Sequence, residues 1–239
     1  MKLLSLLVGM ICTATVAMSC NENDSSDIKI TENREVAKFD RINVSGPAKV
    51  NIVCGQDQSV TVTATDKLLN ALHTEVRDGE LYITFTKKCI KRKNVTVDIC
   101  VENITDLLAS GACDVNFPQY TVLSNLYFKA SGASNVNFSK LEVKGDLNGR
   151  ISGASDVDIH CTADRAKFEV SGASDLDIKN INTSDLDISA SGASDVNVSG
   201  TTEYVNLNAS GASDINAKGL SAKSSDVRGS GASDINFRR

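Results

Sequence analysis

The sequence predicts an all-β protein folded as a right-handed parallel β-helix with coils of about 20 residues. Three observations lead to this fold class. A short motif recurs seven times at nearly constant spacing, each repeat alternates polar and apolar residues, and no repeat carries a helical pattern. A unit of this length, made only of strands and corners, cannot bury its own apolar side, so the units above and below must cover it.

The repeated motif reads Ser-Gly-Ala-x-Asp/Asn, followed by an aliphatic residue, a second Asp or Asn, and another apolar residue. The seven copies begin at residues 110, 131, 152, 171, 191, 210 and 230, so their spacings are 21, 21, 19, 20, 19 and 20 residues. An eighth, degenerate copy, SGPAKVNI, begins at Ser45. This regularity favours coils that stack in register, with equivalent residues about 4.8 Å apart.

One repeat shows how a coil is built. Residues 156–159 alternate polar and apolar side chains, and a second alternating run covers 166–170. The predicted core therefore contains Val157, Ile159 and Phe168. The right-hand rule for parallel crossovers favours a right-handed winding.

The corners between these runs carry small residues. Glycine permits a positive φ or the close approach of the next coil, and the alanine after it is small enough to point into a crowded corner. An antiparallel sandwich is the competing all-β fold, but a sandwich does not require a corner motif at a fixed phase.

The first part of the folded chain is less regular. Strand-like runs cover residues 36–44, 48–53, 60–64 and 81–85. A short helical turn is expected within 66–72, and the pair Asp78-Gly79 predicts a tight turn. We expect 36–109 to form irregular coils that cap one end of the β-helix, and 110–239 to form seven regular coils of the same helix.

The first twenty residues, MKLLSLLVGMICTATVAMSC, have the features of a bacterial lipoprotein signal. Lys2 supplies positive charge, the apolar stretch 3–16 is too short for a permanent membrane span, and small residues precede Cys20. We therefore expect residues 1–19 to be removed as a signal peptide and Cys20 to carry acyl chains. Residues 20–35 begin as a polar tether. An ordinary secretory signal is the alternative.

These features predict that the mature chain is secreted across the inner membrane, lipid-anchored to the outer membrane and displayed at the cell surface. The acidic residues behind the lipidated cysteine resemble export signals of surface lipoproteins. Beyond the signal, the sequence has no hydrophobic run of transmembrane length. The predicted membrane contact is therefore an anchor and not a span.

Once the signal is removed and Cys20 is lipidated, five cysteines remain, an odd number that excludes a complete disulfide framework. They are Cys54, Cys89, Cys100, Cys113 and Cys161. Strand-like runs on both sides of residues 90–94 suggest a hairpin that would place Cys89 opposite Cys100, and a disulfide there is one option. The other option is that all five are small, buried thiols.

The composition excludes several classes of function. The chain has 239 residues and a net charge of −5, so it lacks the basic footprint of a nucleic-acid-binding protein. Aromatic residues make up 5% and Trp is absent, which argues against an aromatic-lined ligand cleft and against base stacking. No nucleic-acid partner is expected.

Stacked coils would align the polar residues of the motif into two outward columns. The first contains Asp114, Asn135, Asp156, Asp175, Asp195, Asp214 and Asp234, and the second contains Asn116, Asn137, Asp158, Asp177, Asn197, Asn216 and Asn236. Two carboxylates about 4.8 Å apart in water repel by about 0.9 kcal/mol, so the first column needs compensation. We expect each carboxylate to accept hydrogen bonds from its own corner, including the serine hydroxyls, and the Asn residues to form an amide ladder. Calcium bound between carboxylates is the alternative; no other cofactor is predicted.

The motifs predict no catalytic centre. The carboxylates repeat uniformly, and no coil departs from the pattern as a general acid and base would require. The two histidines, His73 and His160, are isolated and are expected to be surface or packing residues. Five cations gather between Lys87 and Lys93, which we interpret as a solvated loop or a contact for anionic glycans or lipid headgroups.

Three features resemble the auto-transporter adhesin head domain family, also called the GIN domain family. They are the lipoprotein-like signal, the segment FDRINVSG at 39–46, and the Ser-Gly-Ala-Ser-Asp-Val/Ile-Asn repeats. The resemblance covers residues 36–239. It implies a right-handed β-helix on a secreted or surface-anchored bacterial protein with an adhesive role, and it brings no catalytic residues.

We therefore predict a non-enzymatic cell-envelope lipoprotein that acts as an adhesin or binding module. Its outward binding face would contain Asp156, Asp158, Asp175, Asp177, Asp195, Asp214 and Asp234. The predicted partners are the membrane, through the anchor at Cys20, and a glycan or surface protein; the sequence assigns no oligomeric state. A polysaccharide lyase or hydrolase and a structural envelope protein without a ligand are the alternatives.

Overall fold

The computed structural model describes residues 28–86, 95–122 and 124–238. Strands account for 67% of the described residues and helix for almost none, which confirms the predicted all-β class. The helix found in the described residues is the short α1 (Asp66–Leu69), and none there has the length and apolar character needed to cross a membrane.

The nineteen strands of the described residues belong to one sheet. The first seven are β1 (Ile30–Asn33), β2 (Arg41–Ser45), β3 (Lys49–Cys54), β4 (Ser59–Ala64), β5 (Leu72–Arg77), β6 (Glu80–Phe85) and β7 (Thr96–Val101). The next eight are β8 (Asp106–Ser110), β9 (Asp114–Phe117), β10 (Tyr120–Val122), β11 (Leu126–Ala130), β12 (Asn135–Val143), β13 (Asp146–Ile151), β14 (Asp156–Thr162) and β15 (Arg165–Val170). The last four are β16 (Asp175–Ala190), β17 (Asp195–Ala209), β18 (Asp214–Gly229) and β19 (Asp234–Phe237).

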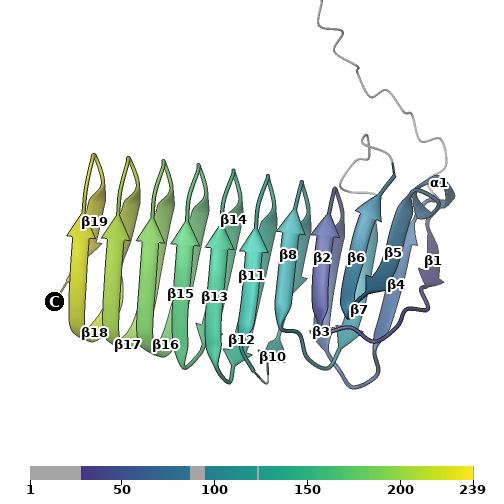
Figure 1. The fold of residues 1–239 in the computed structure, drawn as a ribbon, viewed down its shortest axis with the longest axis horizontal. Helices are drawn as coiled ribbons and strands as arrows, with labels where there is room; N and C mark the ends of the chain where they lie inside the picture. The colour runs from purple at the N-terminus through teal and green to yellow at the C-terminus, as the bar shows by residue number, and fades with distance from the viewer. Residues whose placement is uncertain (1–27, 87–94, 123, 239) are drawn as a thin grey trace, which may run out of the picture.

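The repeats wind into a β-solenoid of about 7 turns, with coils about 20 residues apart. In Figure 1 the strands that face the viewer run upward, the chain turns over at the top, and the rod advances from right to left. This winding is right-handed. The predicted parallel β-helix is therefore confirmed.

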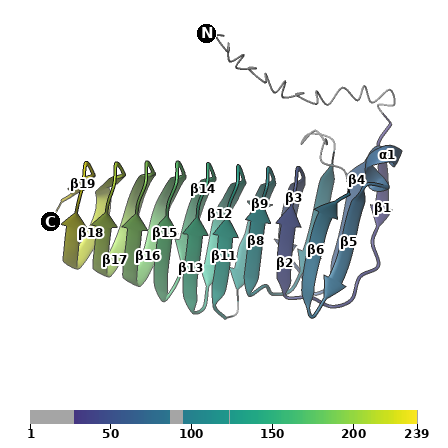
Figure 2. The same cartoon turned by 45° about the horizontal axis from the view of Figure 1, so that its top comes forward.

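Each coil has two long walls, which lie on opposite sides of the rod (Figure 2). The motif wall is the strand segment directly after each Ser-Gly-Ala corner, at residues 114–117, 135–138, 156–159, 175–178, 195–198, 214–217 and 234–237. The return wall is the strand segment that leads into each corner, at residues 106–110, 126–130, 146–151, 165–170, 185–190, 204–209 and 224–229.

The coil formed by β2 and β3 lies out of sequence order in the stack. β2 pairs in parallel with both β6 and β8, and β3 pairs in parallel with both β7 and β9. The degenerate motif copy at Ser45 therefore stacks directly on the copy at Ser110. The chain between these copies continues the rod on the other side of β2 and β3.

β6 and β7 do not form the hairpin that we expected around residues 90–94. β6 pairs with β5 and β2, whereas β7 pairs with β3 and β4. Each strand buries its own apolar residues, such as Leu81 on β6 and Val97 on β7, from a separate side of the same core. Cys100 on β7 is a free thiol, and Cys89 lies outside the described residues.

An antiparallel cap forms the end of the rod that contains α1. β1 pairs with β4, β4 with β7, and β5 with β6, all antiparallel. Asp78 and Gly79 make the predicted tight turn between β5 and β6, with φ of 49° and 77°. α1 falls within the helical turn predicted at 66–72, and it places Leu69 over the end of the core with 4% exposure.

Apolar side chains alternate into the core as predicted. Val157, Ile159 and Phe168 are 2%, 1% and 0% exposed. Aromatic rings fill the middle of the rod: Phe138 stacks on Phe117 with 4.7 Å between ring centroids, and it packs against Phe128 at 5.3 Å.

Gly149 makes room for two of these rings. It lies between Phe128 and Phe168 in the sheet register. A Cβ atom on Gly149 would lie 2.5 Å from Phe128 Cζ and 2.8 Å from Phe168 Cδ1, which is too close for an alanine. Because Gly149 has no side chain, the rings of Phe128 and Phe168 fill the volume that a side chain at position 149 would otherwise take.

The Ser-Gly-Ala corners stack as a glycine column with positive φ. Gly172 has φ of +85°, and a Cβ atom on it would lie 2.6 Å from the carbonyl oxygen of Gly153 in the coil below. Both roles that we expected of the glycine, positive φ and close approach, therefore operate at the same residue.

The expectation that the corner alanine points inward is wrong. Ala154 and Ala173 are exposed, and the serine that follows each of them is fully buried. The hydroxyl of Ser155 donates a hydrogen bond of 3.0 Å to the carbonyl oxygen of Ser152. This local bond satisfies the buried hydroxyl within its own corner, so serine can occupy the inward position.

Candidate functional site

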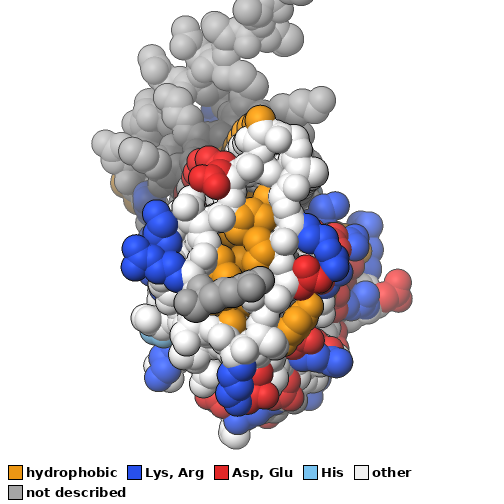
Figure 3. Space-filling model, turned by 90° about the vertical axis from the view of Figure 1, so that its left-hand side faces the viewer, with side chains coloured by type: hydrophobic (Ala, Val, Ile, Leu, Met, Phe, Trp, Pro, Cys, Tyr) orange, Lys and Arg blue, Asp and Glu red, His pale blue; other side chains and the backbone are white. Residues whose placement is uncertain are grey.

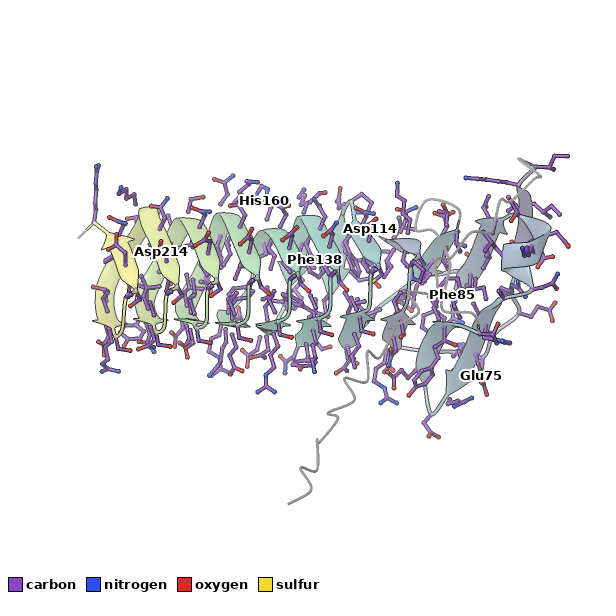
Figure 4. The ribbon with its side chains drawn as sticks, turned by 90° about the horizontal axis from the view of Figure 1, so that it is seen from above. Glu75, Phe85, Asp114, Phe138, His160 and Asp214 are labelled. Atoms are coloured by element: carbon purple, nitrogen blue, oxygen red, sulfur yellow. The ribbon has the colours of Figure 1, made fainter. Side chains whose placement is uncertain are left out.

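The motif wall carries the predicted first column, which the sheet register aligns residue on residue. Its successive pairs are Asp114 with Asn135, Asn135 with Asp156, Asp156 with Asp175, Asp175 with Asp195, Asp195 with Asp214, and Asp214 with Asp234. Figure 4 shows Asp114 and Asp214 on the same side of the rod, with Phe138 between the walls. We call the carboxylates at 156, 175, 195, 214 and 234 the acidic column; all are exposed.

Charge accumulates along the acidic column because no lysine or arginine stands in it between Asp156 and Asp234. Partial burial, followed by the charges of Asp156 and Asp195, raises the pKa of Asp175. Asp214 accepts a hydrogen bond of 3.1 Å from the backbone N–H of Asp234. The repulsion within the column is therefore only partly compensated by hydrogen bonding.

The serine hydroxyls do not supply the compensation that we predicted for these carboxylates. In five of the corners the inward-pointing serine hydroxyl donates to a carbonyl oxygen three residues earlier, as Ser194 does to Ser191 at 3.0 Å. The reason is geometric: the serine side chain points into the core, and the aspartate that follows it points outward.

The second column is better compensated than the first. Lys179 reaches both Asp177, at 2.9 Å, and Asp158, at 3.3 Å. Part of the expected amide ladder is present, because Asn216 Nδ2 donates to Asn197 Oδ1 at 3.1 Å. The two columns together frame a shallow depression of about 370 Å³ over the motif wall, lined in part by Asp114, Asn137 and Asp158.

In the described parts of the chain, no three His, Cys, Asp or Glu side chains converge as metal ligands. His73 and His160 are exposed, and His160 lies next to Lys179 in the sheet register. A carboxylate column on a flat wall presents one oxygen pair per coil, whereas a hard cation needs six or more oxygen ligands around it.

The return wall carries a mixed-charge cluster that we did not predict. Arg165 binds Asp146 through two hydrogen bonds of 2.7 and 2.8 Å, and Lys167 lies 3.5 Å from Asp187. Tyr204, with 39% exposure, lies beside them at the edge of a depression of about 320 Å³. The sequence did contain a signal for this cluster. Asp146 and Arg165 carry opposite charges and are separated by one repeat, so they occupy equivalent positions in successive coils.

The cysteines and the basic segment 87–93 are the remaining candidates from the sequence. Cys54 is exposed, Cys100 is half-buried, and Cys113 and Cys161 are buried, so the option that all the thiols are buried is wrong for Cys54 and Cys100. The lipidation candidate Cys20 and the basic segment 87–93 lie outside the described residues.

A family model described as "Putative auto-transporter adhesin, head GIN domain" matches residues 38–199 and 170–239. The chain belongs to this family. The GIN-domain resemblance of the repeats is therefore confirmed over most of the chain. A comparison with curated proteins finds no match.

Solved structures share the fold of this GIN-domain protein. A putative adhesin from Bacteroides fragilis NCTC 9343 matches with a TM-score of 0.79 and 20% identity, covering 89% of this chain and 98% of that one. A putative adhesin from Parabacteroides distasonis ATCC 8503 gives 0.72 and 21%, covering 88% and 97%. A putative lipid binding protein from the same organism gives 0.65 and 19%, also covering 88% and 97%.

Proposed function

We propose that this GIN-domain protein is a non-enzymatic, lipid-anchored surface adhesin whose motif wall binds an extended partner. The observation that carries the proposal is the acidic column, in which five exposed carboxylates follow one another at one strand spacing. A rod that repeats the same group once per coil can contact a polymer or a broad protein surface at several points, and weak contacts then add.

The charge of the column favours a partner that presents cations. Such a partner is a surface protein with a row of basic side chains, or a glycan that carries amino groups. Electrostatic contacts between exposed groups are screened by salt, because the Debye length is only about 8 Å at physiological ionic strength. Binding through the acidic column should therefore weaken steeply as salt is added.

The proposed location rests on the sequence of the first residues. A charged start, a short apolar stretch and small residues precede Cys20, and a polar segment follows it. An acylated Cys20 would tether the rod to the outer membrane, with the solenoid at the cell surface. The adhesin description of the family supports a surface location.

The uniformity of the walls supports a binding role over catalysis. A lyase or hydrolase needs a unique constellation of acid, base and substrate-orienting groups, whereas the motif wall repeats the same two polar positions from coil to coil. The family description and the adhesin-like solved structures point in the same direction. A rod without any ligand is the remaining alternative.

A screen of glycans and matrix proteins with the purified full chain tests the proposal, with polysaccharide cleavage assayed in parallel. We expect at least one partner to bind, to be released by salt, and to bind much more weakly to the triple variant Asp156→Asn, Asp175→Asn, Asp195→Asn. Each single substitution should have only a small effect. A control variant removes three carboxylates from outside the acidic column: Glu75→Gln, Glu142→Gln and Glu203→Gln.

Equal losses in the two triple variants would show that net charge, and not the acidic column, carries the binding. Cleavage that survives repurification would replace the proposal with an enzymatic function. Neither binding nor cleavage in the two assays would favour a structural protein without a ligand.

A further inference from the structure

The end of the rod formed by β18 and β19 leaves its strand edges unpaired in the described part of the chain. Residues 224–229 pair on one side with 204–209, and β19 pairs on one side with the start of β18. The opposite end is different, because antiparallel strands and α1 form a cap there (Figure 1). An unpaired edge of this kind is a template for further strand pairing.

The core is open at the same end. Figure 3 looks onto it and shows hydrophobic side chains at its centre, surrounded by backbone and uncharged polar side chains. Val227 is 37% exposed, whereas Leu207 and Ile188, which precede it in the same column, are 0% exposed. Ile235 and Phe237 are only partly buried against the core. Apolar side chains from another molecule, packed against this end, would therefore bury Val227, Ile235 and Phe237 as a further coil does inside the rod.

The return-wall edge is complementary to itself when two copies run antiparallel. If Val227 lies on a two-fold axis, Asp226 of one copy faces Arg228 of the other, and the reverse pair forms on the other side of the axis. The small residues Ser225 and Gly229 then face each other as well. Within one chain Arg228 already binds Asp226, so the four charges would form one compact cluster.

Backbone polarity agrees with this register. The N–H of Ser230 donates to the carbonyl of Ala209 in β17, so the even-numbered residues of this edge point their backbone groups into the sheet. Val227 is odd-numbered, and its N–H and C=O point outward. Two copies of Val227 on the axis can thus exchange a pair of hydrogen bonds.

The motif-wall edge is self-complementary about the same axis. Asn236 lies about as far after the Gly231 corner as Val227 lies before it. With Asn236 on the axis, Asp234 faces Arg238 of the second copy, and Ile235 faces Phe237. The N–H of Asp234 donates to Ser213 inside the sheet, so residues 235 and 237 point their backbone groups outward, as this pairing requires.

We propose that two copies of this protein associate through these ends, with β18 and β19 of one copy continuing antiparallel into β18 and β19 of the other. The partner is a second copy of this chain because both edges match their own reversed sequence in charge, size and hydrogen-bond polarity. If the anchor at Cys20 of the proposed function holds, the chain that leads to each anchor starts from β1, which lies in the cap at the far end of each rod. Such a contact could connect two facing surfaces.

Charge reversal at the return-wall edge tests the pairing. The full chain would carry Cys20→Ser throughout, so that no acyl chain can hold two copies together, and sedimentation over a concentration series would report the oligomer. We expect the parent chain to dimerise with increasing concentration. D226R and R228D should each be monomeric, because like charges then meet across the axis. The double variant D226R/R228D should dimerise again.

Mixing gives a sharper result. D226R and R228D, each monomeric alone, should form a heterodimer when combined, because every arginine then faces an aspartate. Circular dichroism melts of each variant establish that it is folded. E142R is the matched control, because it reverses one charge of the ion pair between Glu142 and Lys144, which lies away from this end. E142R should dimerise like the parent.

A parent chain that stays monomeric, or a dimer that is indifferent to D226R and R228D, would overturn the proposal. The assay contains no glycan or matrix protein, so its outcome is independent of the proposed ligand binding.

Discussion

Asp175 lies in the middle of the acidic column, and its ionisation opposes folding. The pKa of its carboxyl is raised in the folded protein by partial burial and by the charges of Asp156 and Asp195. A raised carboxyl pKa means that the folded state binds the proton more tightly than the unfolded chain does. The destabilisation is therefore present above the folded pKa and disappears as the pH falls below the unfolded value.

We expect Asp175→Asn to raise the melting temperature at neutral pH and to leave it unchanged near about pH 3, where the unfolded carboxyl is also protonated. Thermal melts at both pH values measure the difference. Asp177→Asn is the matched control on the same strand, because Asp177 binds Lys179 and its loss should bring no gain. A lower melting temperature for Asp175→Asn at neutral pH would contradict the assignment of repulsion.

The thiols should differ in reactivity according to burial. Burial raises the pKa of the Cys161 thiol to about 12, so the reactive thiolate is scarce at neutral pH, whereas Cys54 is exposed. We expect iodoacetamide to label Cys54 in the folded protein and Cys161 only after unfolding. Peptide mass spectrometry locates the label, and rapid labelling of Cys161 under native conditions would show that the coil opens.

At the scale of elements, the glycine column fixes the corners. Gly172 combines φ of +85° with a neighbouring carbonyl oxygen 2.6 Å from where a Cβ atom would lie. Gly172→Ala should therefore destabilise the protein by more than about 1 kcal/mol, measured by denaturant unfolding. Gly229→Ala is the control, since its added Cβ would meet no atom closer than 3.4 Å. Equal tolerance of both substitutions would mean that the corners can shift.

The aromatic core depends on one missing side chain. Gly149→Ala should be destabilising, because the new methyl group would overlap the rings of Phe128 and Phe168 in a close-packed core. Adding Phe168→Leu to Gly149→Ala should recover part of the stability by making space. If the double variant were less stable than the sum of its single changes, the two sites would not compete for the same volume.

At the scale of the whole molecule, the proposed lipid anchor would determine whether the protein is attached to a membrane. Mass spectrometry of the mature N-terminus should find an acylated Cys20 and no trace of residues 1–19. Cys20→Ser should move the protein from the membrane fraction to the soluble fraction, since several acyl chains bind membranes at about 0.8 kcal/mol per buried CH₂. An unmodified N-terminus on a soluble wild-type protein would indicate an ordinary secretory signal.

The whole fold also shows how far local patterns reach. The repeat spacing and the alternation of residues such as Val157 and Ile159 determined the solenoid, the core and the two polar columns. These features follow from one rule applied to every coil: each strand buries alternate side chains, and equal positions stack. The Asp78-Gly79 turn and the helical turn at 66–72 depend only on neighbouring residues, so the sequence was enough to predict them.

Only the tertiary structure decided the features that depend on segments far apart in the chain. The β2–β3 coil lies between coils that follow it in sequence, and β6 and β7 take separate sides of the core. Serine points inward at five of the corners because the backbone path there, and not residue size, sets the direction of the side chain. The cluster around Arg165 and the self-complementary end arise from pairing between coils, which no single repeat encodes.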